Sequence, residues 1–314
     1  MATLTARISL KGDEPDGPED YLSTSLGVIF PDDIVNQHGD AEHSLLYASP
    51  KLPKTLLIEL AEPEGETDRR LFSHFLWNAS LLLAEFIERD SLEATYDEEK
   101  QQDRGLGGDI SFDTRGLHTL ELGAGTALPS IMAGLLGAAG VVVTDYPAPA
   151  VIKTLRENVA RNLQPDLAPT GQSALVTTSV LVEGHEWGVF DSSSSTAFPC
   201  SHAHLADRLF VADCLWMPWQ HENLRRSIGY FLKRTAAARA WVVAGFHTGR
   251  VKMAGFFDAA ALREEGGVEV ERMWERDCDG VEREWDGERE DDVTERKRWL
   301  VVCVLKRCEG MVDA

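Results

Sequence analysis

The sequence predicts an α/β fold in which a mostly parallel sheet carries helices on both faces. Between residues 117 and 246, short apolar runs alternate with segments whose apolar residues recur at helical spacing. This alternation is typical of parallel strands connected by helices. Beyond residue 267 two apolar strands follow each other without a helix pattern between them, so we expect them to pair antiparallel at the sheet edge.

The first part of the chain is expected to extend this core. Residues 1–26 are rich in Gly, Pro, Asp and Glu and predict a disordered lead-in. Two short apolar runs, His43–Ala48 and Thr55–Leu60, flank a turn with two prolines, which favours a β-hairpin. Apolar residues at helical spacing then predict a helix over Asp68–Arg89.

The predicted core elements follow in order. The strands are Leu117–Gly123, Val141–Tyr146, Ala174–Val182, Arg208–Asp213, Ala240–Phe246, Val268–Trp274 and Trp299–Leu305. The helices are Pro129–Leu136, Pro149–Asn162 and His221–Thr235. The join Glu275–Arg298 is dense in mixed charge and predicts an exposed loop. We therefore expect a lead-in (1–26), an N-terminal extension of hairpin and helix packed on the core (27–110), the core itself (111–308) and a tail (309–314).

Composition limits the class of protein. Of the 314 residues 43% are hydrophobic, enough for a sizeable core, and no apolar run is long enough to span a membrane. No secretory signal is visible at the N-terminus. The five cysteines lack CxxC spacing, which indicates neither a disulfide framework nor a metal site. We expect a cytoplasmic monomer that does not associate with membranes.

The formal net charge of −21 disfavours nucleic acid as a partner, because phosphate binding needs a basic face. The charge would suit a basic protein substrate through electrostatic steering. The alternative, that it only keeps the protein soluble, stays open.

A glycine turn follows the first core strand. Gly123 and Gly125 allow the backbone to approach a ligand where a side chain would block it, at the strand ends where open α/β sheets bind ligands. Asp145 ends the next strand, twenty residues after Gly125, where a carboxylate can accept hydrogen bonds from both ribose hydroxyls of an adenosine. A nicotinamide-dinucleotide site would prefer a third glycine, but Leu128 stands there.

Two motifs carry a resemblance to a known family. Glu121-Leu-Gly-Ala-Gly-Thr-Ala-Leu-Pro-Ser130 and Val142-Val-Thr-Asp-Tyr-Pro147 resemble the class I, seven-strand S-adenosylmethionine-dependent methyltransferases. More narrowly, they resemble the branch of protein-lysine methyltransferases that includes fungal proteins named nicotinamide N-methyltransferase-like. The resemblance covers roughly Leu45–Lys306. It implies a Rossmann-like sheet of seven strands with an antiparallel terminal strand, and S-adenosyl-L-methionine as the cofactor.

The resemblance also implies a cofactor site. Trp77 matches a Trp that this branch brings onto the cofactor, and Trp187 matches a Trp beside the adenine, where an indole can pack. The alternatives are a core Trp77 and a Trp187 that covers the sheet edge. The implied cofactor-binding residues are Trp77, Glu121, Gly123, Ala124, Gly125, Asp145, Tyr146, Trp187 and Ala212.

The candidate catalytic residues close the fourth core strand. Asp213 and Trp216 match the acidic and aromatic positions of a family motif, Asp-x-x-Tyr or Asp-x-x-Phe. Asp213 would orient the acceptor amine and Trp216 would line its path, while a helix N-cap or a structural acid is the alternative role of Asp213. His247 ends the next strand, where it could reach the substrate opening.

Three functions follow from this interpretation. The first is methylation of a lysine or an N-terminal amine of a protein. The second is methylation of a small molecule, with a nicotinamide-like acceptor suggested by the family's names, and the third is a non-catalytic scaffold. A wide groove would favour a protein acceptor, and a lid built from residues 1–40 a small one.

Overall fold

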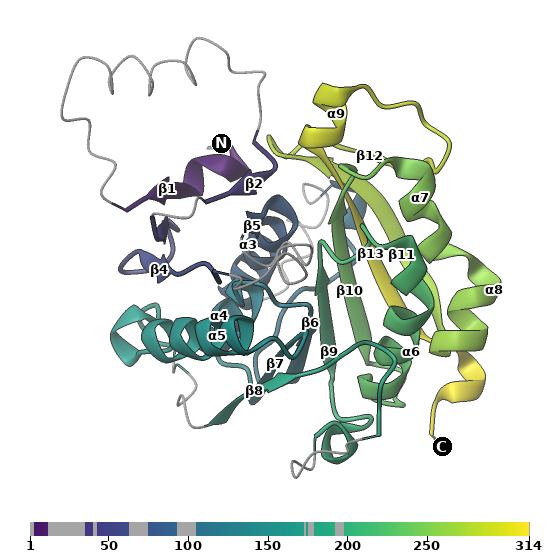
Figure 1. Ribbon diagram of the computed structural model, residues 1–314, viewed down its shortest axis with the longest axis horizontal. Helices are drawn as coiled ribbons and strands as arrows, with labels where there is room; N and C mark the ends of the chain where they lie inside the picture. Colours follow the sequence, from purple (N-terminus) through teal and green to yellow (C-terminus); the bar gives the residue numbers. More distant parts are fainter. Residues whose placement is uncertain are drawn as a thin grey trace.

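An eight-stranded sheet with the order β12-β11-β13-β10-β9-β6-β7-β8 forms the centre of the computed structural model (Figure 1). The structure describes residues 3–11, 35–39, 43–62, 75–92, 105–172, 174, 179–191 and 198–313. The parallel strands are β6 (His118–Leu122), β7 (Gly140–Asp145), β8 (Val180–Gly184), β9 (Arg208–Ala212) and β10 (Arg239–Gly245). β13 (Trp299–Arg307) is antiparallel to both β10 and β11 (Val268–Asp277), and β12 (Glu282–Glu284) forms the edge. The predicted α/β fold is confirmed, with β12 as an eighth strand that the sequence did not predict.

Helices cover both faces of this sheet (Figure 1). One face packs against α3 (Asn78–Leu92), α4 (Leu128–Leu135) and α5 (Pro149–Asn162), and the other against α6 (His221–Phe231) and α7 (Arg250–Ala254). Alternate residues of β10 therefore enter two different cores, Trp241 and Val243 in one, Val242 and Ala244 in the other. This explains why the strands are apolar throughout instead of alternating with polar residues.

A smaller antiparallel sheet precedes the core. Its strands are β1 (Ile8–Leu10), β3 (Leu45–Tyr47) and β4 (Leu56–Ile58), and β3 and β4 form the predicted hairpin. The predicted disordered lead-in is wrong for residues 4–10, which form a turn of 3₁₀ helix and then β1, where Leu4 is buried. Residues 12–26 of the lead-in lie outside the described residues.

The predicted helix over Asp68–Arg89 is wrong at its start, since α3 begins at Asn78. Just before it, β5 (Leu76–Trp77) pairs antiparallel with β2 (Gln37–His38). The side chain of Asn78 joins the two segments, because Nδ2 donates to the Val35 carbonyl (2.9 Å) and Oδ1 lies 2.7 Å from Nε2 of His38. This pairing keeps Trp77 in extended backbone. Residues 63–74 lie outside the described part of the chain.

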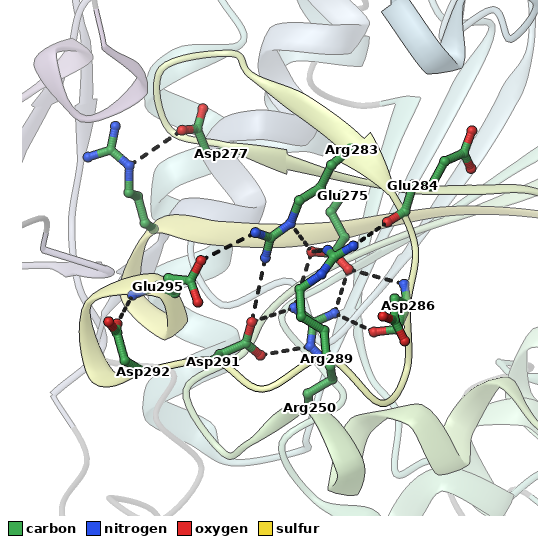
Figure 2. A network of polar contacts seen from close by, with 11 residues as sticks. Arg250, Glu275, Asp277, Arg283, Glu284, Asp286, Arg289, Asp291, Asp292 and Glu295 are labelled. Atoms are coloured by element: carbon green, nitrogen blue, oxygen red, sulfur yellow. Dashed lines mark hydrogen bonds and ion pairs between the residues drawn. The ribbon is translucent and has the colours of Figure 1, made fainter.

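The charged join after β11 is folded, so the predicted exposed loop over Glu275–Arg298 is wrong. β11 continues to Asp277, β12 follows, and α9 (Val293–Arg298) leads into β13. Figure 2 shows how charged side chains of this segment converge on Arg250, the first residue of α7. We call this group, Arg250, Glu275, Arg283, Arg289 and Asp291, the arginine cluster.

The centre of the arginine cluster, Arg250 and Glu275, is buried, and the charges of the cluster pair with one another. The Arg250 guanidinium lies 2.5 Å from Glu275 and 2.7 Å from Asp291, and the two carboxyl side chains are 0% and 1% exposed. Arg283 and Arg289 reach Glu275 at 2.7 and 2.8 Å. Hydrogen-bonded ion pairs of this kind can be accommodated away from water where an isolated charge cannot. The cluster thereby fixes the chain directly after β10.

Among the residues that the structure describes, no helix is long and apolar enough to cross a membrane. No three of their His, Cys, Asp or Glu side chains are grouped to hold a metal ion.

Candidate active site

A cleft of about 860 Å³, part of it open to solvent, lies at the carboxyl ends of β6, β7, β8 and β9. Loops that follow parallel strands meet at this edge of the sheet. The residues that line it are Phe75, Trp77, Ser80, Gly123, Ala124, Gly125, Thr126, Asp145, Tyr146, His185, Glu186, Trp187, Ala212, Asp213, Cys214, Trp216, Met217 and Gln220.

The glycine turn forms the floor of the cleft. Both glycines have positive φ, +66° at Gly123 and +55° at Gly125, which favours glycine. A Cβ at Gly123 would lie 2.6 Å from Sγ of Cys214 and 3.0 Å from the Trp187 ring, whereas a Cβ at Gly125 would meet no described atom within 4 Å. Gly123 therefore allows close packing under Trp187, and Gly125 leaves open space where a ligand can approach the backbone.

Asp145 holds this turn. One of its carboxyl oxygens accepts a hydrogen bond from the Gly125 amide and the other from the Tyr146 amide, each at 2.7 Å. Burial raises the pKa of Asp145 to about 6, against the effect of the two amides. A carboxylate offers about four acceptor positions, so two amides leave capacity for hydroxyl donors in the cleft.

Asp213, His247 and Trp77 come together from three segments. Asp213 has a φ of +59° and accepts a hydrogen bond from the Gly245 amide (3.2 Å). Nδ1 of His247 lies 3.8 Å from the Asp213 carboxyl, and the His247 ring stacks on Trp77 with 4.7 Å between centroids. Burial raises the pKa of Asp213, and the charge of His247 opposes that rise. A buried carboxyl is thus held in place at the cleft wall.

The structure brings ten of the eleven predicted site residues to the cleft, including both candidate catalytic residues. Glu121 does not line it. The Glu121 carboxyl is fully buried and accepts hydrogen bonds from the amide (3.2 Å) and hydroxyl (2.5 Å) of Ser130, and burial raises its pKa to about 8. Glu121 therefore fastens the start of α4 to β6, and the prediction of a direct cofactor contact has no support from its position.

Eight residues of the cleft were not predicted. Half of them are sequence neighbours of predicted ones, such as Glu186 beside Trp187 and Cys214 beside Asp213. His185 is not next to a predicted residue, and no motif indicated it. Its amide donates to the Asp145 carbonyl (2.7 Å), and its ring lies 3.0 Å from Oγ of Ser227 on α6. The other five are Phe75, Ser80, Thr126, Met217 and Gln220.

Comparison with known proteins identifies the family. Residues 64–261 match a family model described as lysine methyltransferase. The chain belongs to the lysine methyltransferase family. The predicted resemblance is thereby confirmed, and so is the class of enzyme, a methyltransferase.

Curated relatives and a solved structure agree with this family. The chain is 32% identical over 213 residues to the protein N-terminal and lysine N-methyltransferase EFM7 of Gibberella zeae, covering 66% of this chain and 70% of the relative. A protein of the same name from Schizosaccharomyces pombe is 28% identical over 210 residues, covering 65% and 68%. The methyltransferase SMU.776, solved with SAH, shares the fold with a TM-score of 0.51 at 12% identity, over 92% of this chain and 65% of that one.

Proposed function

We propose that this lysine methyltransferase family member transfers a methyl group from S-adenosyl-L-methionine to a lysine or an N-terminal amine of a protein. The observation that carries the proposal is the cleft, where the open space above Gly125 and the Asp145 carboxyl lie together with Asp213 and Trp216. The relatives named for N-terminal and lysine methylation support the same acceptors.

The residues of the cleft fit the proposed cofactor. The Gly123–Gly125 turn would let the cofactor lie close to the backbone. Asp145 would accept hydrogen bonds from the ribose hydroxyls, and the Trp187 indole would pack on the adenine. When bound, S-adenosylmethionine supplies a methyl group on a positively charged sulfur, which a neutral amine takes up by displacement. The residues of the chain have to hold the amine in line with the methyl group and to limit the access of water. Positioning alone can lower the activation barrier by roughly 7–11 kcal/mol.

Asp213 is suited to prepare the amine. A lysine amine has a reference pKa of about 10.4, so it must lose a proton before it can react. The Asp213 carboxylate can accept a hydrogen bond from the ammonium form and take up its proton, which leaves a neutral amine and a neutral carboxyl group. Nδ1 of His247 lies 3.8 Å from that carboxyl. Trp216 lines the same wall, where an aromatic face attracts the ammonium form as it enters.

Incubation of the purified protein with radiolabelled S-adenosylmethionine and a cell extract tests the proposal. After separation of the extract into protein and small-molecule fractions, we expect the label on protein. Label confined to the small-molecule fraction would point to a small acceptor and contradict the proposed protein substrate. Absence of label from both would leave only the scaffold interpretation.

Asp145→Ala is expected to weaken S-adenosylmethionine binding by about 1.5–3 kcal/mol, the scale of a hydrogen bond to a charged group. Calorimetric titration measures the change. A matched control is Asp207→Ala, because Asp207 also accepts a backbone hydrogen bond, from His118 (2.9 Å), but lies at the opposite end of the strands. Equal affinities of Asp145→Ala and the wild type would remove Asp145 from the cofactor site.

A further inference from the structure

The loops around the mouth of the cleft expose large apolar side chains. Tyr146 follows β7, Val189 follows β8, and Trp219 follows β9, with exposed fractions of 40%, 48% and 72%. Trp219 lies on the short turn Pro218–Gln220, between two residues that line the cleft. Trp is enriched at binding interfaces relative to the rest of the protein surface, so an exposed indole at the opening favours a binding surface there.

Trp219 adjoins the residues that line the cleft. Its ring meets the ring of Trp216 edge-on, with 6.5 Å between centroids. Next to it, Oε1 of Gln220 accepts a hydrogen bond from Asn223 (2.7 Å), and Gly188 packs so closely that a Cβ there would lie 2.5 Å from Oδ1 of Asn223. The loop after β8 and the turn with Trp219 thus form one rim around the start of α6.

The cleft attracts positive charge. Three carboxyl groups line it, those of Asp145, Glu186 and Asp213, while no Lys or Arg does so within the described ranges. Glu186 is exposed as well as lining the cleft, so a substrate that enters can reach it. Together with the net charge of −21, this arrangement favours a cationic partner. An indole face adds to that preference, since it attracts ammonium and guanidinium groups.

We propose that Trp219 and Glu186 bind a Lys or Arg side chain next to the methylated amine, in an extended basic segment of the substrate protein. This inference rests on the proposed function and adds a recognition element outside the reacting centre. Trp216 forms the wall of the acceptor path, and the 6.5 Å between the two Trp rings corresponds to about two residues of extended chain at roughly 3.3 Å each. The bound cation therefore belongs within a few residues of the acceptor.

A pool of short synthetic peptides tests the proposal. Each peptide has a free N-terminus and one central lysine, and the positions around the lysine are randomised. With wild-type enzyme and labelled S-adenosylmethionine, we expect the methylated peptides to be enriched in Lys or Arg near the methylated amine. Trp219→Ala and Glu186→Gln should each reduce this enrichment and raise the KM for an enriched peptide about three- to tenfold. The cofactor affinity of Trp219→Ala should stay unchanged.

Val293→Ala is the control, because Val293 is 71% exposed, much like Trp219, but lies on α9. It should leave the enrichment and the KM unchanged. No enrichment for basic residues, or enrichment that persists in Trp219→Ala, would overturn the inference. Label on protein in a cell extract but on no peptide of the pool would also overturn it while the proposed function stands. Absence of label from both the extract and the peptide pool would overturn this inference and the proposed function together.

Discussion

Asp213→Asn is expected to lower turnover by about 100-fold or more, the scale of losing a positioned acid–base group, while cofactor affinity stays within about threefold of wild type. The lost interaction matters chiefly in the transition state. Asn is the appropriate replacement because it tolerates the left-handed backbone at this position, φ +59°. Its Oδ1 can also keep accepting the hydrogen bond from Gly245. Steady-state kinetics with the labelled acceptor, alongside calorimetry, separates the two effects.

The pH profile sharpens this prediction. Burial raises the pKa of Asp213, so wild-type activity should fall as the pH drops through that value and the carboxylate becomes protonated. The amide of Asp213→Asn cannot titrate there, so the ratio of wild-type to variant activity should rise with pH across this range. A fully active Asp213→Asn would show that the assignment is wrong and that the cofactor site alone positions the amine.

Glu275→Ala is expected to lower the free energy of unfolding by about 3–5 kcal/mol, the scale of removing one partner from a buried ion pair. Glu275 is fully buried and meets three guanidinium groups, those of Arg250, Arg283 and Arg289 (Figure 2). Without this carboxylate the three guanidinium groups remain close together, with Asp291 as the only carboxylate of the cluster left to balance them. Urea denaturation of the two proteins measures the difference.

Glu157→Ala serves as the control for this measurement. Glu157 pairs with Lys153 on the surface of α5 at 3.9 Å, and both side chains are largely exposed, 49% and 76%. The loss of such a pair should change stability by no more than about 0.5 kcal/mol. A Glu275→Ala variant as stable as Glu157→Ala would mean that the arginine cluster contributes nothing to the fold.

Part of the site could be predicted from strand periodicity. The residues concerned lie at strand ends, where the periodicity gives both the position and the direction of the residues that follow, whereas Trp77, Trp187 and Trp216 were predicted from the family resemblance. Gly123, Gly125 and Asp145 could therefore be placed at one edge of the sheet, and so could Asp213 on the next parallel strand.

The features that the sequence did not predict depend on contacts between distant segments. Trp77 is held extended by pairing with residues 37–38, although apolar spacing continues through it as if the helix began earlier. The charged residues of 275–298 are typical of a solvated loop when read alone, since their partner Arg250 lies far away in the sequence. Glu121 is a separate, local case, because its carboxyl accepts hydrogen bonds from Ser130, nine residues further along the chain, and does not line the cleft.

Calorimetric titration of the wild-type protein with S-adenosylmethionine and its demethylated product tests the central claim most directly, since the proposed chemistry depends on the cleft above Gly125. Binding of both ligands with micromolar affinity is the expected result. No heat with either ligand, together with binding of a nicotinamide dinucleotide, would contradict the assignment of the cleft to S-adenosylmethionine.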